Sequence, residues 1–200
     1  MDINTSTFIA LDLETTGLDI ERDHIISIAA IPIKDMKILM KKAFFTLIKP
    51  EIYKYDTVKY HGILLKDLSN APSFEEIAPA LLNILDGILV GHSIQFDYLF
   101  LQRYFKKLSK DFRRKYIDIA ELETALAYLK CSKNHSLKLD LDTIAHSYGI
   151  KCSFRHNALS DAFIAAQIFQ IQIVRNKIRT TKQLFNIIKN MRLCKASCFV

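Results

Sequence analysis

The sequence has no tryptophan and little glycine, proline or cysteine, with five, four and four residues in a chain of 200. So little glycine and proline excludes collagen-like and linker-rich chains, and a hydrophobic content of 50% is typical of a globular protein. Four cysteines are too few for a disulfide scaffold of this size. Free thiols fit a reducing compartment, which predicts a cytoplasmic protein.

Long hydrophobic runs are also missing. Lys, Asp, Gln or His interrupts every apolar stretch before it reaches the roughly eighteen residues that a membrane span requires. No basic region precedes the short apolar run near the N-terminus. We therefore expect a soluble protein with no export signal and no membrane partner. The chain length predicts a single compact domain.

Acidic residues are absent from one part of the chain. Residues 175–200 hold seven Lys or Arg and no Asp or Glu, so they carry the whole net charge of +7. Such a segment is typical of contact with an anionic partner such as nucleic acid, or of a solvated surface. We predict a domain over residues 1–175 and a basic helical tail over residues 176–200, whose apolar residues share one broad face.

Local patterns predict an α/β protein. Apolar and β-branched runs predict three neighbouring strands at residues 7–13, 25–33 and 37–48. After residue 50, short apolar runs alternate with apolar residues at helical spacing. These patterns predict strands at 88–90 and 116–117 and helices at 74–86, 96–108, 119–129, 137–148, 158–174 and 181–193. The order of these elements predicts a mixed five-stranded sheet flanked by helices.

Two acids interrupt the first predicted strand. Asp12 and Glu14 are two residues apart, so their side chains point to the same face of the strand. Two neighbouring carboxylates in an apolar strand destabilise the fold unless a cation or strong hydrogen-bond donors compensate their charge. The pair therefore indicates a divalent-metal site, with a solvated strand end as the alternative.

Two further acids stand at predicted helix starts. Asp97 follows the strand at 88–90, and Asp161 opens the helix that begins after Asn157. The helix dipole favours an acid in a first turn, which explains each of these residues singly. It does not explain His156, which precedes Asp161 by five residues. That spacing brings the two side chains together only if His156 lies on the preceding loop.

These segments resemble the motifs of the DEDDh 3′-to-5′ exonucleases, a family of which the proofreading epsilon subunit of bacterial DNA polymerase III is a representative. The first motif is similar to Leu11–Leu18, the second to His92–Asp97, and the third to the segment from His156 to Ala162. Tyr60–Ile63 matches a family segment between the first two motifs. The resemblance covers about residues 7–172, with the motifs in the family's order and spacing.

The resemblance implies a ribonuclease-H-like fold and the hydrolysis of a phosphodiester with two metal ions. Hard oxygen ligands suit Mg²⁺ or Mn²⁺. The metal ligands implied are Asp12, Glu14, Asp97 and Asp161. Asp12 would bridge both ions, and Asp97 would position the attacking water. His156 would deprotonate that water.

The resemblance also implies contacts with the terminal nucleotide, through Thr15, Leu18, His61 and Phe96. For Leu18 and Phe96, packing in the core is the alternative. Two positions depart from the family pattern, and neither of them is an implied metal ligand. Ser93 stands where relatives usually have Asn, and Ser27 where many have Glu.

The leading hypothesis is a proofreading or repair exonuclease that releases nucleoside 5′-monophosphates from single-stranded DNA ends. An exoribonuclease similar to ribonuclease T or oligoribonuclease is the alternative, because the 2′-hydroxyl is sensed by shape and backbone contacts. The run Glu14–Gly17 is more similar to the DNA-directed members. A non-catalytic adaptor on a polymerase or sliding clamp is the alternative from another class, although an adaptor does not need a complete acid set with His156. The segment Gln183–Phe185 faintly resembles clamp-binding peptides.

Overall fold

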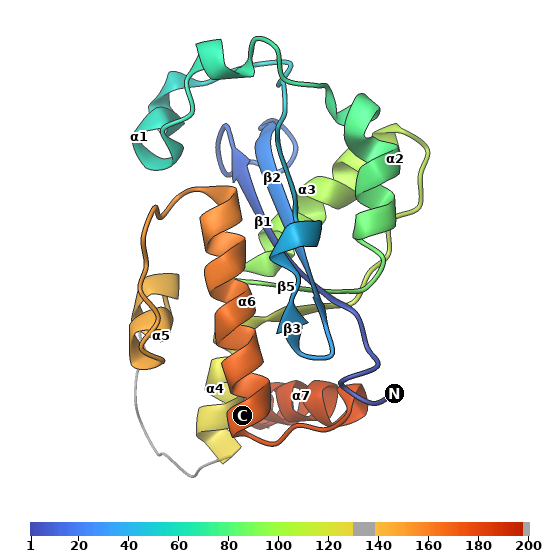
Figure 1. The fold of residues 1–200 in the computed structure, drawn as a ribbon, viewed down its shortest axis with the longest axis vertical. Coiled ribbons are helices and arrows are strands. Elements are labelled where there is room, and N and C mark those ends of the chain that lie inside the picture. Colours follow the sequence, from blue (N-terminus) through green and yellow to red (C-terminus); the bar gives the residue numbers. More distant parts are fainter. Residues whose placement is uncertain (130–138, 198–200) are drawn as a thin grey trace.

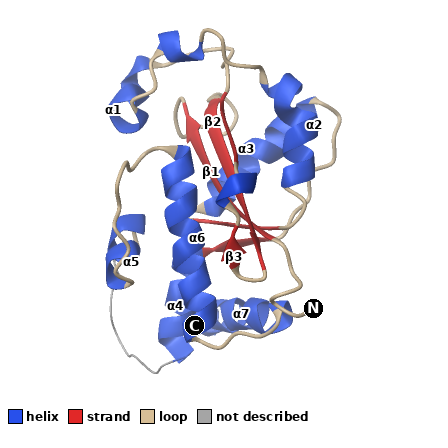
Figure 2. Ribbon diagram, viewed as in Figure 1, coloured by secondary structure: helices blue, strands red, loops and turns tan. Residues whose placement is uncertain are grey.

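The protein has one mixed β-sheet with helices packed against it (Figures 1 and 2). The computed structural model describes residues 1–129 and 139–197, with the backbone alone for 194–197. The strands are β1 (Phe8–Thr15), β2 (Ile25–Lys34), β3 (Lys37–Ile38), β4 (Phe44–Leu47), β5 (Ile88–Gly91) and β6 (Tyr116–Asp118). Their order is β3-β2-β1-β5-β6, with β4 also paired to β2. Strand β1 is antiparallel to β2 and parallel to β5, and β5 is parallel to β6.

The prediction of one strand over residues 37–48 is wrong in one respect. A 3₁₀ turn, η1 (Met40–Lys42), separates β3 from β4, and both segments pair with β2. The interruption lies opposite Pro32, whose carbonyl oxygen accepts a hydrogen bond from the Leu39 N–H at 2.9 Å. Because proline has no N–H to donate in return, the ladder cannot continue past it. The sheet thus has six segments in five positions.

The helices are α1 (Val58–His61), α2 (Phe74–Ile84), α3 (Ile94–Lys107), α4 (Ile119–Leu129), α5 (Leu141–Ser147), α6 (Ala158–Arg175) and α7 (Thr181–Ser197). Two 3₁₀ turns, η2 (Tyr55–Thr57) and η3 (Leu65–Leu68), flank α1. The predicted helices are all found, although α3 begins two residues earlier than expected. Helix α5 begins at Leu141, and residues 137–138 of its predicted span lie outside the described residues.

Side-chain caps fix where two helices begin. Asn157 Oδ1 accepts hydrogen bonds from the backbone N–H groups of Leu159 and Ser160, at 3.1 and 3.2 Å. Asp118 Oδ1 accepts one from the N–H of Ala120 at 2.9 Å. Both caps satisfy N–H groups that the helix itself leaves unpaired. The starts of α6 and α4 are therefore set by the local sequence.

Alternate residues of β1 face two separate parts of the core. Phe8 and Ala10 pack in the cluster that includes α6, whereas Ile9 and Leu11 pack in the cluster that includes α2 and α3. Asp12 and Glu14 continue the first of these two series. The two acids therefore lie on the face of the sheet that α6 covers.

Helix α7 is packed against the rest of the protein. Leu184, Ile188 and Met191 are buried, and Leu184 and Ile188 belong to the same core cluster as α6. The helix lies beside α4, at the end of the molecule where α6 finishes (Figure 1). No helix in the described part of the chain is long and apolar enough to cross a membrane.

Candidate active site

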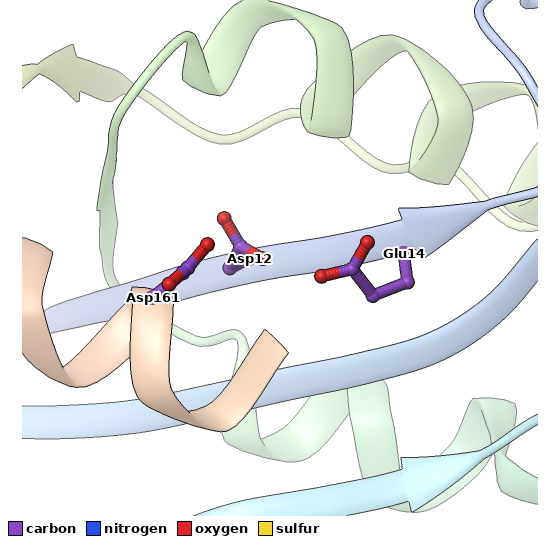
Figure 3. A group of neighbouring side chains, drawn as sticks. All are labelled: Asp12, Glu14 and Asp161. Atoms are coloured by element: carbon purple, nitrogen blue, oxygen red, sulfur yellow. The ribbon is translucent and has the colours of Figure 1, made fainter. Parts of the chain in front are cut away.

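Three of the predicted acids converge at one end of the sheet (Figure 3). Asp12 and Glu14 project from β1, and Asp161 projects from the first turn of α6. Each offers one carboxylate oxygen such that the three oxygens lie within 4.8 Å of one another. The register of β1 changes between Glu14 and Thr15, directly beside this cluster. Such irregularities commonly lie next to active sites, where they redirect side chains.

Asp97 reaches the same place from the first turn of α3. It is buried, and its Oδ1 accepts a hydrogen bond from the backbone N–H of Leu13 at 3.1 Å. The pairing of β1 with β5 ends at Ala10, so this N–H lies beyond the strand ladder. A buried N–H needs a partner, and the Asp97 carboxylate supplies one. The four predicted acids therefore meet at β1, between α3 and α6.

Burial and mutual repulsion make these carboxylates hard to ionise. Burial, together with the charges of Asp97, Asp161 and Glu14, raises the pKa of Asp12 well above its ordinary value. Burial is likewise the main cause that raises the pKa of Asp97. For Glu14, burial and the charge of Asp161 raise the pKa to about 7. When they ionise, these acids carry an excess of negative charge that a cation would relieve.

One oxygen of the cluster is left without a partner. Asp161 Oδ1 is buried and accepts no hydrogen bond within the described part of the chain. A buried, unpaired carboxylate oxygen is unfavourable unless something binds it. An acid-only, all-oxygen donor set is the kind that Mg²⁺ and Mn²⁺ prefer. The residues present therefore fit a hard divalent cation.

His156 lies on the loop before α6, as its spacing from Asp161 requires. Its backbone N–H donates to Asp161 Oδ2 at 3.2 Å, and its side chain is exposed. The residue has φ +60°, in the left-handed region that few residues other than glycine adopt. Its ring lies 6.5 Å, centre to centre, from the ring of Tyr60. The segment around α1 therefore lies next to the start of α6 (Figure 1).

The residues predicted to contact a nucleotide occupy different environments. Leu18 is 84% exposed in the loop after β1, so core packing does not explain it. Phe96 is half-buried in the first turn of α3, with its ring centre 4.8 Å from that of Phe100. His61, which ends α1, has a ring nitrogen 3.0 Å from Thr57 Oγ1, and burial lowers its pKa. Thr15 Oγ1 donates to the Gly17 carbonyl at 2.7 Å.

The loop that carries Leu18 is closed by a buried acid. Asp23 Oδ1 accepts hydrogen bonds from Thr16 Oγ1 at 3.1 Å and from Lys54 Nζ at 2.5 Å. A side chain at Gly17 would collide with Asp23, because a Cβ there would lie 2.4 Å from Asp23 Oδ2. The Thr16–Gly17 pair is thus needed for the shape of the loop.

Sequence reasoning assigned no role to Arg155 and Asp142. Arg155 forms an ion pair with Asp161, and its Nε donates to Asp142 Oδ1 at 2.8 Å. Asp142 lies in α5, outside the recognised motifs. The signal in the sequence was the Arg155–His156 pair, but its partner in α5 could not be identified without the tertiary structure.

Four acids around one strand of a mixed sheet, with a histidine just before the covering helix, are the arrangement expected of a nuclease with a ribonuclease-H-like fold. Residues 9–169 match the RNase T family model, which is described as Exonuclease. That span includes the four acids and His156. The chain belongs to this exonuclease family.

Curated relatives agree with this assignment. The chain is 34% identical to DNA polymerase III subunit epsilon of Aquifex aeolicus, over 82% of this chain and 78% of the relative. It is also 34% identical to the epsilon subunit of Buchnera aphidicola subsp. Schizaphis graminum, over 93% and 85%. It is 38% identical to the PolC-type DNA polymerase III of Thermotoga petrophila, over 82% of this chain. In that last comparison the chain spans 12% of the relative's length.

Solved structures confirm the fold. Exonuclease X in complex with 5′ overhanging duplex DNA has a TM-score of 0.69 and 19% identity, over 91% of this chain and 98% of that chain. The zinc-bound complex of E. coli exonuclease I with single-stranded DNA has a TM-score of 0.73 and 18% identity, over 91% and 42%. The predicted ribonuclease-H-like fold is therefore confirmed.

Proposed function

We propose that this chain is a metal-dependent 3′-to-5′ exonuclease that releases nucleoside 5′-monophosphates from single-stranded DNA ends. The observation that carries the proposal is the convergence of Asp12, Glu14 and Asp161, with ligand oxygens within 4.8 Å of one another. Membership of the exonuclease family supports hydrolysis of a phosphodiester. The epsilon relatives and the DNA complex of exonuclease I support DNA as the substrate.

The acids are proposed to hold two Mg²⁺ or Mn²⁺ ions. Asp12, which lies between Glu14 and Asp161 in Figure 3, would hold the ions together with these two residues. When bound, such ions stabilise the negative charge that develops on the attacking and leaving oxygens of an in-line displacement. Asp97, fixed by the N–H of Leu13, positions the attacking water.

His156 is the proposed general base. Its side chain is exposed, so water can reach it, and its backbone is tied to Asp161. A neutral imidazole can accept a proton from water. The residue has a left-handed backbone, and its ring centre lies 6.5 Å from that of Tyr60.

The terminal nucleotide is proposed to contact Thr15, Leu18, His61 and Phe96. Leu18 is exposed and belongs to a loop that Asp23 holds in place, so it presents an apolar surface that can pack on a base. His61 is held by contacts on both ring nitrogens, with Thr57 Oγ1 and the N–H of Ile63, each at 3.0 Å. Because the Leu18 loop and the His61 ring are both held in place, they would help to orient the scissile bond for hydrolysis.

A basic groove next to α7 supports a polyanionic substrate. The groove has a volume of about 690 Å³ and lies between α7 and the β6–α4 segment, away from the four acids. Its charged residues are Arg114, Lys115, Lys182, Lys189, Arg192 and Glu121. Glu121 is paired with Arg192, which leaves a clear excess of positive charge. Phosphates of a single strand would be attracted here by that charge.

The same proposal includes a polymerase as the protein partner, because the relatives are named as DNA polymerase III proteins. Contact of the Gln183–Phe185 segment with a sliding clamp would need α7 to detach, since Leu184 is buried. The proposal also divides the chain into an exonuclease unit at 1–175 and a basic tail at 176–200. It further includes a cytoplasmic location.

The experiment compares matched, 5′-labelled DNA and RNA oligonucleotides with Mg²⁺, Mn²⁺ or EDTA, with products resolved by length. We expect stepwise shortening of DNA from the 3′ end, which EDTA stops and added metal restores. Asp12→Asn is the inactive control, and Asp111→Asn, at an exposed pair with Arg113, is the active control. Faster cleavage of RNA would favour the exoribonuclease, and cleavage of a circular single strand or activity in EDTA would refute the mechanism. No cleavage, with capture of a polymerase, would favour the adaptor.

A further inference from the structure

We propose that Arg155, held in place by Asp142, is a positioning residue that turns the Asp161 carboxylate toward the metal. The inference rests on the proposed function, because it takes Asp161 as a metal ligand. It assigns a role to Arg155 and Asp142, which are not among the four proposed metal ligands.

The two oxygens of Asp161 have different surroundings. Oδ2 is engaged by the ion pair with Arg155 Nη1 and by the backbone N–H of His156, at 3.2 Å. Oδ1 is buried and has no hydrogen-bond partner in the part of the chain that the structure describes. One oxygen is thus held by protein donors and the other remains available to a ligand. A carboxylate held in this way cannot exchange its two oxygens by rotation without breaking both contacts.

Arg155 is itself anchored from the opposite side. Its Nε donates to Asp142 Oδ1 at 2.8 Å, so the guanidinium spans two carboxylates with two different nitrogens. The planar fork of arginine suits this arrangement, and a lysine nitrogen cannot reproduce it. Side-chain exposure falls from 47% at Asp142 to 20% at Arg155 and 8% at Asp161. The three residues therefore form a chain of contacts from the surface of α5 to the buried acid of α6.

Two other roles for Arg155 predict different results. If the guanidinium only joined α5 to the α6 loop, its removal would lower stability and leave metal affinity unchanged. If it mainly competed with the ion for Asp161, its removal would raise metal affinity. Positioning is favoured because Asp142 offsets the charge of Arg155, while the geometric restraint on Oδ2 remains. Residues that hold metal ligands in this way typically contribute about 10–100-fold to metal affinity or activity.

The test measures Mn²⁺ binding directly, by the electron paramagnetic resonance signal of the free ion, on the full chain without nucleic acid. We expect Arg155→Gln to raise the Mn²⁺ dissociation constant by about 10–100-fold. Arg155→Lys should weaken binding too, because it keeps the charge but loses the fork. Asp142→Asn keeps every metal-ligand candidate and should raise the dissociation constant by a smaller factor. Arg113→Gln, which breaks an exposed pair with Asp111, is the matched control and should bind as the unmodified chain does.

Circular dichroism and thermal melting first establish that each variant is folded. If Arg155→Gln does not fold, Asp142→Asn decides, since Asp142 is half-exposed and lies outside the cluster. Unchanged or tighter Mn²⁺ binding in the folded variants overturns the positioning role and leaves the proposed exonuclease intact. An unmodified chain that neither binds Mn²⁺ nor cleaves DNA overturns both.

Discussion

Asp97 Oδ1 accepts a hydrogen bond from the backbone N–H of Leu13 at 3.1 Å, although 84 positions separate the two residues. Leu13 lies between Asp12 and Glu14, so this bond fixes α3 against the strand that carries two of the acids. Stability and catalysis therefore depend on the same side chain, and different substitutions should separate the two.

Asp97→Asn should fold at least as well as the unmodified chain while losing nuclease activity. The amide oxygen can still accept the bond from Leu13, and the cost of burying a carboxylate disappears, since burial raises the pKa of Asp97. Asp97→Ala should lose about 1–3 kcal/mol of stability, because the buried N–H is left unpaired. Thermal melting and the oligonucleotide assay check both variants. Equal melting temperatures for the two variants would contradict the role of the bond.

Asp12→Asn and Asp161→Asn should change the stability of the metal-free protein in opposite directions. Asp12 has three acids near it, so neutralisation should stabilise the fold by about 1 kcal/mol or more. Asp161 is paired with Arg155, so its neutralisation should cost about 1–3 kcal/mol. Thermal melting in EDTA, in a buffer slightly above neutral pH, measures both changes. Stabilisation by Asp161→Asn would contradict the importance of the ion pair.

The free energy of unfolding of the metal-free protein should fall as pH rises from about 5 to 8. Burial and the charge of Asp161 raise the pKa of Glu14 to about 7, from an ordinary value of 4.5. The folded state thus retains a proton that the unfolded chain releases, and this stabilisation is lost as pH rises through the folded-state value. Urea unfolding in EDTA across this range measures the slope. Glu14→Gln should flatten it, and an equally steep slope in that variant would point to other groups.

His156→Asn should lower the rate of hydrolysis by about 10²–10⁴-fold and remove the limb of the pH–rate profile that reports the proton acceptor. Asparagine tolerates the left-handed backbone, so the hydrogen bond from the residue 156 N–H to Asp161 should persist. His146→Gln, on the exposed side of α5, is the control. A pH–rate profile that stays the same in His156→Asn would mean that another group accepts the proton.

Removal of residues 176–200 should lower the melting temperature, because Leu184, Ile188 and Met191 are buried. Each such side chain contributes about 1.5–3 kcal/mol when fully buried.

The paired substitution Lys182→Gln and Lys189→Gln leaves this apolar face of α7 intact and tests the basic groove alone. It should keep the melting temperature and reduce the salt dependence of single-strand binding, by about 0.7 in log–log slope for each phosphate that the protein no longer neutralises. An unchanged slope would remove the groove from the substrate path.

Several features of this protein were determined by local sequence. The period of two in a strand places Asp12 and Glu14 on one face, whatever the rest of the fold does. The caps at Asn157 and Asp118 depend on local sequence alone, because a cap needs only the next three residues of the chain. For the same reason the helices were predicted in the right places, with errors of a few residues at their ends. The family motifs added which acids, separated along the chain, belong to one site.

Other features were decided by the tertiary structure. Pro32 ends the pairing between β2 and its neighbour at a distance along the chain, so the break between β3 and β4 could not be predicted from residues 37–48 alone. The Asp142–Arg155–Asp161 contacts join α5 to α6 through space, and no periodicity relates them. The apolar face of α7 was visible in the sequence, but its burial in the core shared with α6 was not. Local sequence sets which face of an element is apolar or charged, whereas only the packing of distant elements decides which groups meet there.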